Sequence, residues 1–279
     1  MSDPVLEGDN TTFSLETKIL PSLGPDQVLV KCLYFSNDPA QRGWIQKDVD
    51  RDRLYTAPVE KGEVMRAFAI AEVVESNADS LKQGQLVLGT FGWTEYAVAG
   101  VKEVRPIQAD DSAGIRPTHF IGALGGPGLT AYNGLIDVAR ATASDTVVVS
   151  GAAGATGSMV VQLAKHIVGC KKGHWHRWRI VACGAVATYN SMGETGIKNW
   201  FEIIINRIEV KGFIVTDAIE SGKAGPWVQE LIKYAKEGRI QIGPETETVV
   251  PTRFEDVPKT WMMLFKGGNM GKLLTQIQA

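Results

Sequence analysis

The sequence predicts a two-domain α/β protein in which a β-barrel-like domain is joined to a parallel sheet with helices. Short strands separated by turn residues fill residues 13–104, a pattern typical of small barrels. Residues 146–165, TVVVSGAAGATGSMVVQLAK, predict a buried strand, a glycine turn and a helix in that order. Short strand patterns return after residue 239, so the C-terminal segment is expected either to rejoin the first domain or to form a small unit of its own.

The composition is that of a globular protein without a strong charge bias. The 279 residues are 44% hydrophobic and 22% charged, with a formal net charge of −2. This length buries a large core and is sufficient for two domains. The near-neutral charge offers no electrostatic footprint for nucleic acid or an anionic membrane, so neither is expected as a partner. The first residues show no targeting pattern and no apolar run reaches about 18 residues, which favours a soluble, cytoplasmic protein.

Short apolar segments alternate with turn residues in the first domain. The segments that predict strands are residues 27–33, 68–76, 84–89 and 93–98. Their close and regular spacing indicates a barrel-like sheet. The loops between the first two segments carry Arg42 and Arg66, which could reach a phosphate or a substrate, although most loop arginines are solvated surface.

A glycine-rich turn follows the predicted buried strand at residues 146–150. Gly151, Gly154 and Gly157 would let the backbone approach a pyrophosphate, and the N–H groups and dipole of the next helix would hold its charge. The spacing is GxxGxxG rather than GxGxxG, so the interpretation depends on the strand and helix around it. The alternative is an ordinary tight turn between a strand and a helix.

The remaining segments predict more of the parallel sheet and then a return to short strands. Residues 122–135 predict a glycine-rich turn that runs into a helix. Further helices are expected at residues 197–205, 227–236 and 254–265, and strands at 179–183, 210–217, 239–242, 247–250 and 272–277. The strand at 179–183 leads into Gly184 and a polar loop that contains Tyr189. The carboxyl ends of such strands are where open α/β sheets bind their ligands.

Neither the cysteines nor the histidines predict a metal site or a disulfide framework. The three cysteines are far apart and form no CxxC pair: Cys32, Cys170 and Cys183. This usage suits a reducing compartment. No histidine precedes His119, and His174-x-His176 has no second ligand cluster near it in the sequence. Catalytic zinc needs three converging protein ligands, so no bound metal is expected.

Six short motifs follow one another along the chain. They are Asp38-Pro39-x-x-Arg42-Gly43, Gly128-Leu129-Thr130-Ala131-Tyr132, the glycine turn with its flanks from Val149 to Ser158, Cys183-Gly184-Ala185-x-x-x-Tyr189-Asn190, Gly212-Phe213-Ile214-Val215, and Gly268-Asn269-x-Gly271-Lys272. Together they resemble the zinc-independent medium-chain dehydrogenase/reductases, in particular the leukotriene B4 dehydrogenase, prostaglandin reductase and alkenal double-bond reductase branch. The resemblance runs from about residue 13 to the C-terminus.

The resemblance implies a specific domain organisation. Residues 1–121 and 239–279 would form a GroES-like β-barrel catalytic domain, and residues 122–238 an abridged Rossmann-type parallel sheet domain that binds the cofactor. A homodimer is also implied, because the strand at residues 211–215 is a sheet edge in that family and pairs with its symmetry mate.

The implied activity is the NADPH-dependent reduction of the carbon–carbon double bond of α,β-unsaturated ketones or aldehydes. Tyr189 would stabilise or protonate the enolate, because charge that develops on the carbonyl oxygen needs a donor aimed at it. The implied contacts to NADP(H) come from the glycine turn, two strand ends and two further segments: Ala153, Gly154, Ala155, Thr156, Gly157, Thr130, Cys183, Gly184, Ala185, Tyr189, Phe213, Ile214, Val215 and Asn269.

The chain departs from the family pattern between residues 170 and 179. The family has two further βα units there, which amount to roughly 60 residues. The strand at 179–183 is therefore expected either to dock beside residues 146–150 or to keep its family position and leave an unfilled slot in the sheet. Loss of that length would remove on the order of 3 to 9 kcal/mol of folding free energy. A catalytically inactive or binding-only derivative is the alternative to an enzyme.

Overall fold

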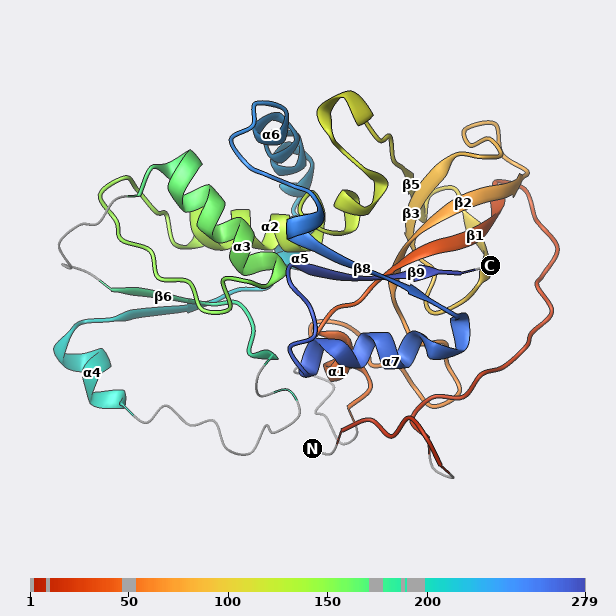
Figure 1. Ribbon diagram of the computed structural model, residues 1–279, viewed down its shortest axis with the longest axis horizontal. Helices are drawn as coiled ribbons and strands as arrows, with labels where there is room; N and C mark the ends of the chain where they lie inside the picture. The colour runs from red at the N-terminus through yellow and green to blue at the C-terminus, as the bar shows by residue number, and fades with distance from the viewer. Residues whose placement is uncertain are drawn as a thin grey trace. The chain divides into compact units, whose positions relative to one another are not determined.

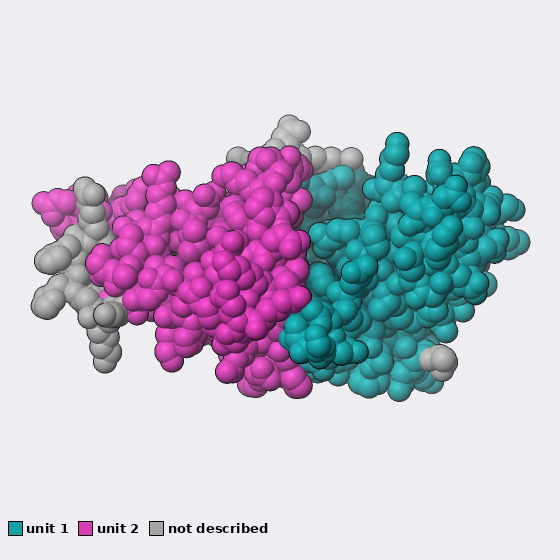
Figure 2. Space-filling view, turned by 90° about the horizontal axis from the view of Figure 1, so that it is seen from above, with its two compact units in different colours: residues 1–121, 247–269, 273–279 teal, residues 122–246, 270–272 magenta. Residues whose placement is uncertain are grey.

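The computed structural model describes residues 3–8, 11–46, 54–170, 178–186, 189 and 199–278. The chain has the predicted α/β class and divides into two compact units, coloured teal and magenta in Figure 2. Unit 1 consists of Met1–Ile121, Glu247–Asn269 and Leu273–Ala279, and unit 2 of Gly122–Thr246 and Met270–Lys272. The C-terminal segment therefore rejoins the first unit, and it does so at Glu247, later than the predicted position 239.

Residues 239–246 belong to unit 2 because they bond to the helical segment 155–168. The Gln241 N–H donates to Gln162 Oε1 over 2.6 Å, and Arg239 Nη2 donates to the His166 carbonyl over 3.1 Å. The predicted strand at residues 239–242 is wrong, since these residues form no ladder and bond to side chains and a helix end instead.

Unit 1 is built on an antiparallel sheet with the strand order β5-β3-β2-β1-β9-β8, in which β4 also pairs with β1. Its strands are β1 (Gln27–Ser36), β2 (Phe68–Ser76), β3 (Leu86–Thr90), β4 (Tyr96–Gly100), β5 (Val104–Pro106), β8 (Glu247–Thr252) and β9 (Lys272–Ile277). Along its second edge β1 pairs first with β4 and then with β9. Register shifts at Leu29/Val30 and Cys32/Tyr34 mark irregularities in β1, which are the kind of feature that bends a strand.

The core of unit 1 follows the two-residue period of its strands. Val28, Val30 and Cys32 are each at most 1% exposed, whereas the residues between them are only partly buried. The same face of β2 adds Ala69, Ala71 and Val73 to this cluster. The helical segment of η8 (Phe254–Asp256), α7 (Val257–Met262) and η9 (Met263–Phe265) supplies the fully buried Trp261, as the sequence predicts for residues 254–265.

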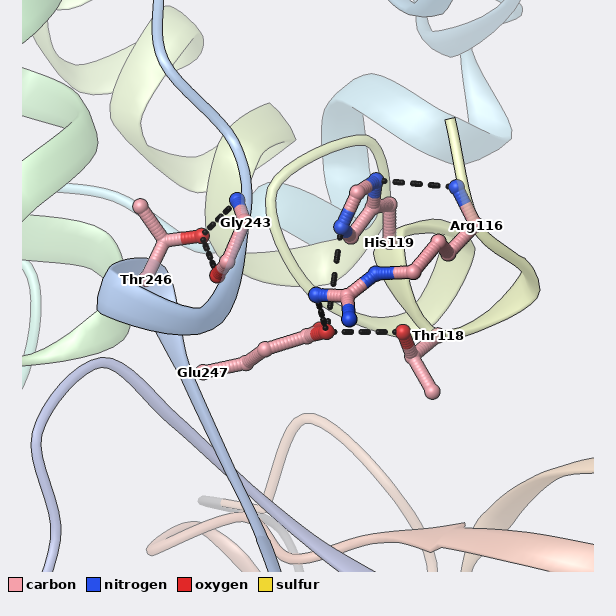
Figure 3. A network of polar contacts seen from close by, with 6 residues as sticks. All are labelled: Arg116, Thr118, His119, Gly243, Thr246 and Glu247. Atoms are coloured by element: carbon pink, nitrogen blue, oxygen red, sulfur yellow. Dashed lines mark hydrogen bonds and ion pairs between the residues drawn. The ribbon is translucent and has the colours of Figure 1, made fainter. Parts of the chain in front are cut away.

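A buried carboxylate lies where the chain re-enters unit 1 (Figure 3). Glu247 Oε1 accepts a hydrogen bond from Arg116 Nη2 at 2.7 Å and one from Thr118 Oγ1 at 2.8 Å. His119 Nε2 lies 3.7 Å from the same oxygen, and His119 Nδ1 accepts from the Arg116 N–H at 3.2 Å. The network therefore joins the last residues before the chain leaves unit 1 to the first residues of β8.

Removal of the charge on Glu247 is expected to destabilise unit 1. In Glu247→Gln, the amide keeps one oxygen but places an N–H₂ group among three donors, so the free energy of unfolding should fall by about 1 to 3 kcal/mol. Urea denaturation followed by tryptophan fluorescence measures the change. Glu245→Gln is the matched control because Glu245 is exposed two residues away, and its midpoint should stay at the wild-type value. Equal midpoints for both variants would contradict a structural role for the network.

Unit 2 contains helices around a short parallel pair of strands. Its elements are α2 (Gly126–Tyr132) with its continuation Asn133–Val138, α3 (Ala155–Gln162) with its continuation Leu163–Val168, β6 (Arg179–Ala182), α4 (Trp200–Ile205), β7 (Glu209–Gly212), α5 (Val215–Glu220) and α6 (Ala224–Lys236). Helices α2, α3 and α6 lie close together (Figure 1). Gly128 permits this approach, since a Cβ there would lie 1.8 Å from the Ala123 carbonyl oxygen and 3.2 Å from Leu231 Cδ1.

The predicted buried strand at residues 146–150 is not a strand in the structure. β6 pairs with β7 in register Arg179↔Glu209, and no ladder joins either of them to residues 146–150 in the described part of the chain. Without a partner strand the segment has no ladder of backbone hydrogen bonds, and Val148 is 78% exposed. Docking of residues 179–183 as a strand beside 146–150 is therefore wrong, although Arg179 Nη2 pairs with Asp145 Oδ1 over 2.6 Å. The unfilled slot stays a prediction.

The predicted strand at residues 210–217 is also shorter than expected. β7 ends at Gly212, and Val215 begins helix α5 where the sequence predicts a strand to residue 217. In α4, the large apolar residues Trp200, Phe201 and Ile204 are each at least 60% exposed. Exposed apolar residues on this scale indicate a surface that lacks part of its covering.

Candidate functional site

The glycine turn and the start of α3 form a compact bend. Gly151 has a φ of +61°, a conformation that only glycine adopts without strain. The Gly154 N–H donates to the Gly151 carbonyl over 2.9 Å, and Gly154 is the N-cap of α3. A Cβ on Gly157 would lie 2.2 Å from the Gly151 oxygen, so the first turn of α3 rests directly on the bend. Gly151 is therefore required by its backbone conformation, and Gly157 by the close approach of the helix to the bend.

Three N–H groups at the start of α3 precede its first intrahelical hydrogen bond. That bond joins the Ser158 N–H to the Gly154 carbonyl over 2.9 Å, so the N–H groups of Ala155, Thr156 and Gly157 have no intrahelical acceptor. With the positive end of the helix dipole, the N–H groups of Thr156 and Gly157 provide the usual binding arrangement for an anion. Buried Met159 and Leu163 anchor the helix from its other face. The residues predicted to cradle a pyrophosphate, Gly154 to Gly157, thus form the start of α3 and its N-cap.

A pocket of about 610 Å³ lies at the carboxyl ends of β6 and β7. Its lining residues come from both strand ends, the loop after β6 and the start of α5: Ala182, Cys183, Gly184, Ala185, Tyr189, Gly212, Phe213, Ile214 and Asp217. Ligands of open α/β sheets bind at such strand ends, outside the sheet. A Cβ placed on Gly134 would lie 3.0 Å from the Phe213 ring, so the helical segment 133–138 packs against that ring.

Tyr189 folds back over the end of β6. Its phenol oxygen accepts a hydrogen bond from the Ala185 N–H at 3.4 Å, and a Cβ on Gly184 would lie 3.2 Å from that oxygen. The phenol thus uses its oxygen as an acceptor and keeps its proton for donation. No other partner of this hydroxyl occurs among the residues that the structure describes. A half-buried tyrosine with a donor proton at a pocket can stabilise negative charge on a ligand oxygen.

The structure brings some of the predicted contacts together and leaves others apart. Six of them line the pocket: Cys183, Gly184, Ala185, Tyr189, Phe213 and Ile214. Ala153, Gly154, Ala155, Thr156 and Gly157 form the bend, which is not part of that lining. The Thr130 hydroxyl donates to the Gly126 carbonyl within α2, and Val215 begins α5. Asn269 belongs to unit 1, so nothing places it at the pocket.

Asp217 lines the pocket although it was not predicted as a site residue. The sequence places it at the end of a strand, whereas in the structure it lies in the first turn of α5. It is the carboxylic acid among the pocket's lining residues. One feature of the sequence could have indicated Asp217: an acidic residue that follows shortly after the glycine at which a parallel strand ends.

The two loop arginines of unit 1 have structural partners. Arg66 lies 5.4 Å from the centre of the Trp44 ring and donates to Thr56 Oγ1 at 3.1 Å and to the Ala57 carbonyl at 2.9 Å. Arg42 is 5% exposed, and burial lowers its pKa. These contacts agree with packing roles for both side chains.

Cys32 and Cys183 differ in burial, which governs how readily a thiol is alkylated. Burial raises the pKa of Cys32 to about 12, so about one Cys32 in 10⁴ is a thiolate at pH 8. Burial of the sulfur also raises the pKa of Cys183, although that residue as a whole is exposed. Iodoacetamide at pH 8 is therefore expected to label Cys183 while Cys32 stays unmodified, as peptide mass mapping can measure. Labelling of Cys32 at the same rate as Cys183 in the folded protein would contradict this order; in denaturant both should react.

Within the described ranges, no group of three or more His, Cys, Asp or Glu side chains could hold a metal ion. His174 and His176 lie outside the described residues. Among the helices that the structure describes, none is both long and apolar enough to cross a membrane.

Comparisons with known proteins agree with the fold and identify the family. A family model described as the N-terminal domain of oxidoreductase matches residues 2–107. YfmJ of Bacillus subtilis, which bears the name of an NADP-dependent oxidoreductase, is 30% identical over 95% of this chain and 92% of its own. Prostaglandin reductase 1 of Sus scrofa is 26% identical over 95% of this chain and 94% of its own. The chain belongs to the zinc-independent medium-chain dehydrogenase/reductases, in the branch of the prostaglandin and alkenal reductases.

A solved structure shares the fold over the whole chain. CurA of Vibrio vulnificus in complex with NADPH superimposes with a TM-score of 0.78, at 24% identity, over 100% of this chain and 98% of CurA. The alignment with YfmJ extends over 327 positions, more than the 279 residues of this chain, so that relative has residues without a counterpart here. The place of the gap in this chain, predicted between residues 170 and 179, stays a prediction.

Proposed function

We propose that the protein is an NADPH-dependent reductase of the carbon–carbon double bond of α,β-unsaturated ketones or aldehydes. The relatives named above include an NADP-dependent oxidoreductase and a prostaglandin reductase, and a protein of the same fold binds NADPH. The bend of this chain has the groups that such a dinucleotide needs, since free helical N–H groups and a glycine that admits close approach are both present. When bound, the reduced nicotinamide supplies the hydride.

Each part of the site has a separate role in this proposal. The N–H groups of Thr156 and Gly157, at the start of α3, bind the pyrophosphate. The side chains of Phe213 and Ile214 give the pocket an apolar side, against which the nicotinamide ring would pack. The Tyr189 hydroxyl donates a hydrogen bond to the carbonyl oxygen of the substrate and stabilises or protonates the enolate that forms.

The single observation that supports this proposal most strongly is the position of Tyr189. Its hydroxyl lies at the pocket formed by the carboxyl ends of two parallel strands, with its proton available for donation. The test uses NADPH with both C4 hydrogens of the nicotinamide replaced by deuterium and a small enone, with the product analysed by NMR. We expect deuterium at the β-carbon of a saturated ketone. Consumption of NADPH without a deuterated product, or no consumption at all, would contradict the proposal.

A catalytically inactive or binding-only derivative is the second candidate. It is supported by residues 146–150, which form no strand and in which Val148 is 78% exposed, since this segment leads into the cofactor bend. Saturable NADPH binding without enone reduction would favour this candidate. No saturable binding would indicate that the cofactor function is lost as well.

We also propose a homodimer that forms through the edge of β7. Among the described strands β7 pairs only with β6, so its other edge has backbone groups available for a second chain. Val210 on this strand is 48% exposed. Sedimentation velocity should detect a species of twice the chain mass, and a monomer at micromolar concentration would contradict this proposal.

A further inference from the structure

The C-terminal motif Gly268-Asn269-x-Gly271-Lys272 contacts the cofactor bend through its backbone. The Gly271 N–H donates to the Ala153 carbonyl over 2.8 Å, and Gly154 and Gly271 form an isolated parallel bridge. Residues 270–272 are part of unit 2, so this contact lies within one compact unit. The segment is held firmly, since Lys272 is only 3% exposed and continues into β9.

This contact completes the hydrogen bonding of one peptide group in the bend. The carbonyl of Ala153 accepts from Gly271, and the N–H of Gly154, in the same peptide group, donates to the Gly151 carbonyl over 2.9 Å. A planar peptide that is bonded at both ends cannot rotate without loss of both bonds. The N–H groups of Thr156 and Gly157 follow in the first turn of α3 and remain available to an anion.

We propose that Gly271 is a positioning residue for the cofactor bend: its N–H fixes the Ala153–Gly154 peptide so that a carbonyl oxygen does not turn toward the bound pyrophosphate. A carbonyl that faced the anion would repel it, whereas in the present orientation the Ala153 carbonyl oxygen is bonded to the Gly271 N–H. The role rests on the proposed function, because it concerns the same bend. Gly271, in the C-terminal motif, thus has a structural role that does not depend on any contact of Asn269.

Gly271 has a φ of +63°, so a side chain at this position strains the backbone that carries the donor. In Gly271→Ala, the segment is expected to relax away from the left-handed region and to weaken the bond to Ala153. Gly267→Ala is the matched control, because Gly267 has a φ of +66° and a Cβ there meets no atom within 4 Å. Both variants introduce a similar backbone strain, but only Gly271→Ala lies at the bridge between Gly154 and Gly271. Gly271→Asn provides an intermediate, since asparagine tolerates this conformation better than alanine.

Two measurements test the proposal. Amide hydrogen exchange of the cofactor-free protein reports the protection of Gly154, and fluorescence titration reports the Kd for NADPH. In Gly271→Ala we expect faster exchange at Gly154 and a Kd raised about tenfold, because small displacements of binding groups weaken their action strongly. Gly271→Asn should give smaller changes of the same sign, and Gly267→Ala should match the wild type in both.

The outcomes separate this proposal from the proposed function. Unchanged exchange at Gly154 in both Gly271 variants would overturn the positioning role, as would faster exchange with an unchanged Kd. If the wild type did not bind NADPH, the proposed function would fail, and inorganic pyrophosphate would replace NADPH as the probe of the same bend. A pyrophosphate Kd equal in wild type and Gly271→Ala would then overturn the positioning role. If Gly271→Ala did not fold, the comparison of Gly271→Asn with Gly267→Ala would decide.

Discussion

Tyr189→Phe is expected to lower kcat for enone reduction by about 10²-fold, the loss typical of one donor that stabilises a developing oxyanion. The phenylalanine ring keeps the shape of the pocket wall and removes only the hydroxyl, whose single described partner is the Ala185 N–H at 3.4 Å. The affinity for NADPH should stay within about twofold of the wild type, because the pyrophosphate groups at α3 are unchanged. Steady-state kinetics with a small enone and a separate NADPH titration measure the two quantities.

The control for this variant is Tyr96→Phe. Tyr96 lies on β4 in unit 1 and is 40% exposed, so removal of its hydroxyl should leave kcat unchanged. The solvent isotope effect on kcat gives a further readout, since loss of a proton donor should alter it, whereas a general disturbance of packing should not. If kcat of Tyr189→Phe equalled that of Tyr96→Phe, the proposed role of Tyr189 as a hydrogen-bond or proton donor to the substrate would be wrong.

Gly157→Ala is expected to abolish NADPH binding at concentrations up to about 10²-fold above the wild-type Kd. The added Cβ would meet only backbone atoms: the Gly151 oxygen at 2.2 Å, the Gly151 carbonyl carbon at 2.8 Å and Ala152 Cα at 2.9 Å. Backbone atoms cannot move aside as the end of a flexible side chain can, so the bend and the start of α3 must separate. The free energy of unfolding should also fall, by about 1 to 3 kcal/mol.

Gly126→Ala is the matched control for Gly157→Ala. Gly126 also lies at the start of a helix and is exposed, and a Cβ added there would meet no atom within 4 Å. Alanine favours helix over glycine, but Pro127 disfavours a helical residue with a Cβ before it, so the free energy of unfolding should stay within about 1 kcal/mol of the wild type and NADPH should bind normally. Normal binding in Gly157→Ala as well would show that the cofactor does not use this bend.

The elements of unit 1 could be predicted because local pattern and tertiary partners agree there. β2 has the predicted bounds of residues 68–76, and the alternation of Val28, Val30 and Cys32 identifies the core face of β1. The bend was predictable for the same reason, since each glycine answers a local need for close packing or for positive φ. Such needs leave a direct trace in the sequence.

The wrong or missing predictions concern segments whose structure depends on contacts with residues that are distant in the sequence. Residues 146–150 have the composition of a buried strand, but a strand requires neighbours for its backbone, and β6 pairs with β7 instead. Asp217 was missed because the turn from β7 into α5 depends on packing that periodicity does not reveal. The approach of Gly271 to Ala153 joins residues more than 100 positions apart, and no local pattern specifies such a contact.

The proposed function depends on one property of the protein, the binding of NADPH at the start of α3. Titration of the purified protein with NADPH, followed by the quenching of tryptophan fluorescence, tests this directly. We expect a saturable curve with one site per chain and a Kd in the micromolar range, which disappears in Gly157→Ala and persists in Gly126→Ala. A linear response without saturation in the wild type, or the same saturable curve in both variants, would contradict binding at this bend.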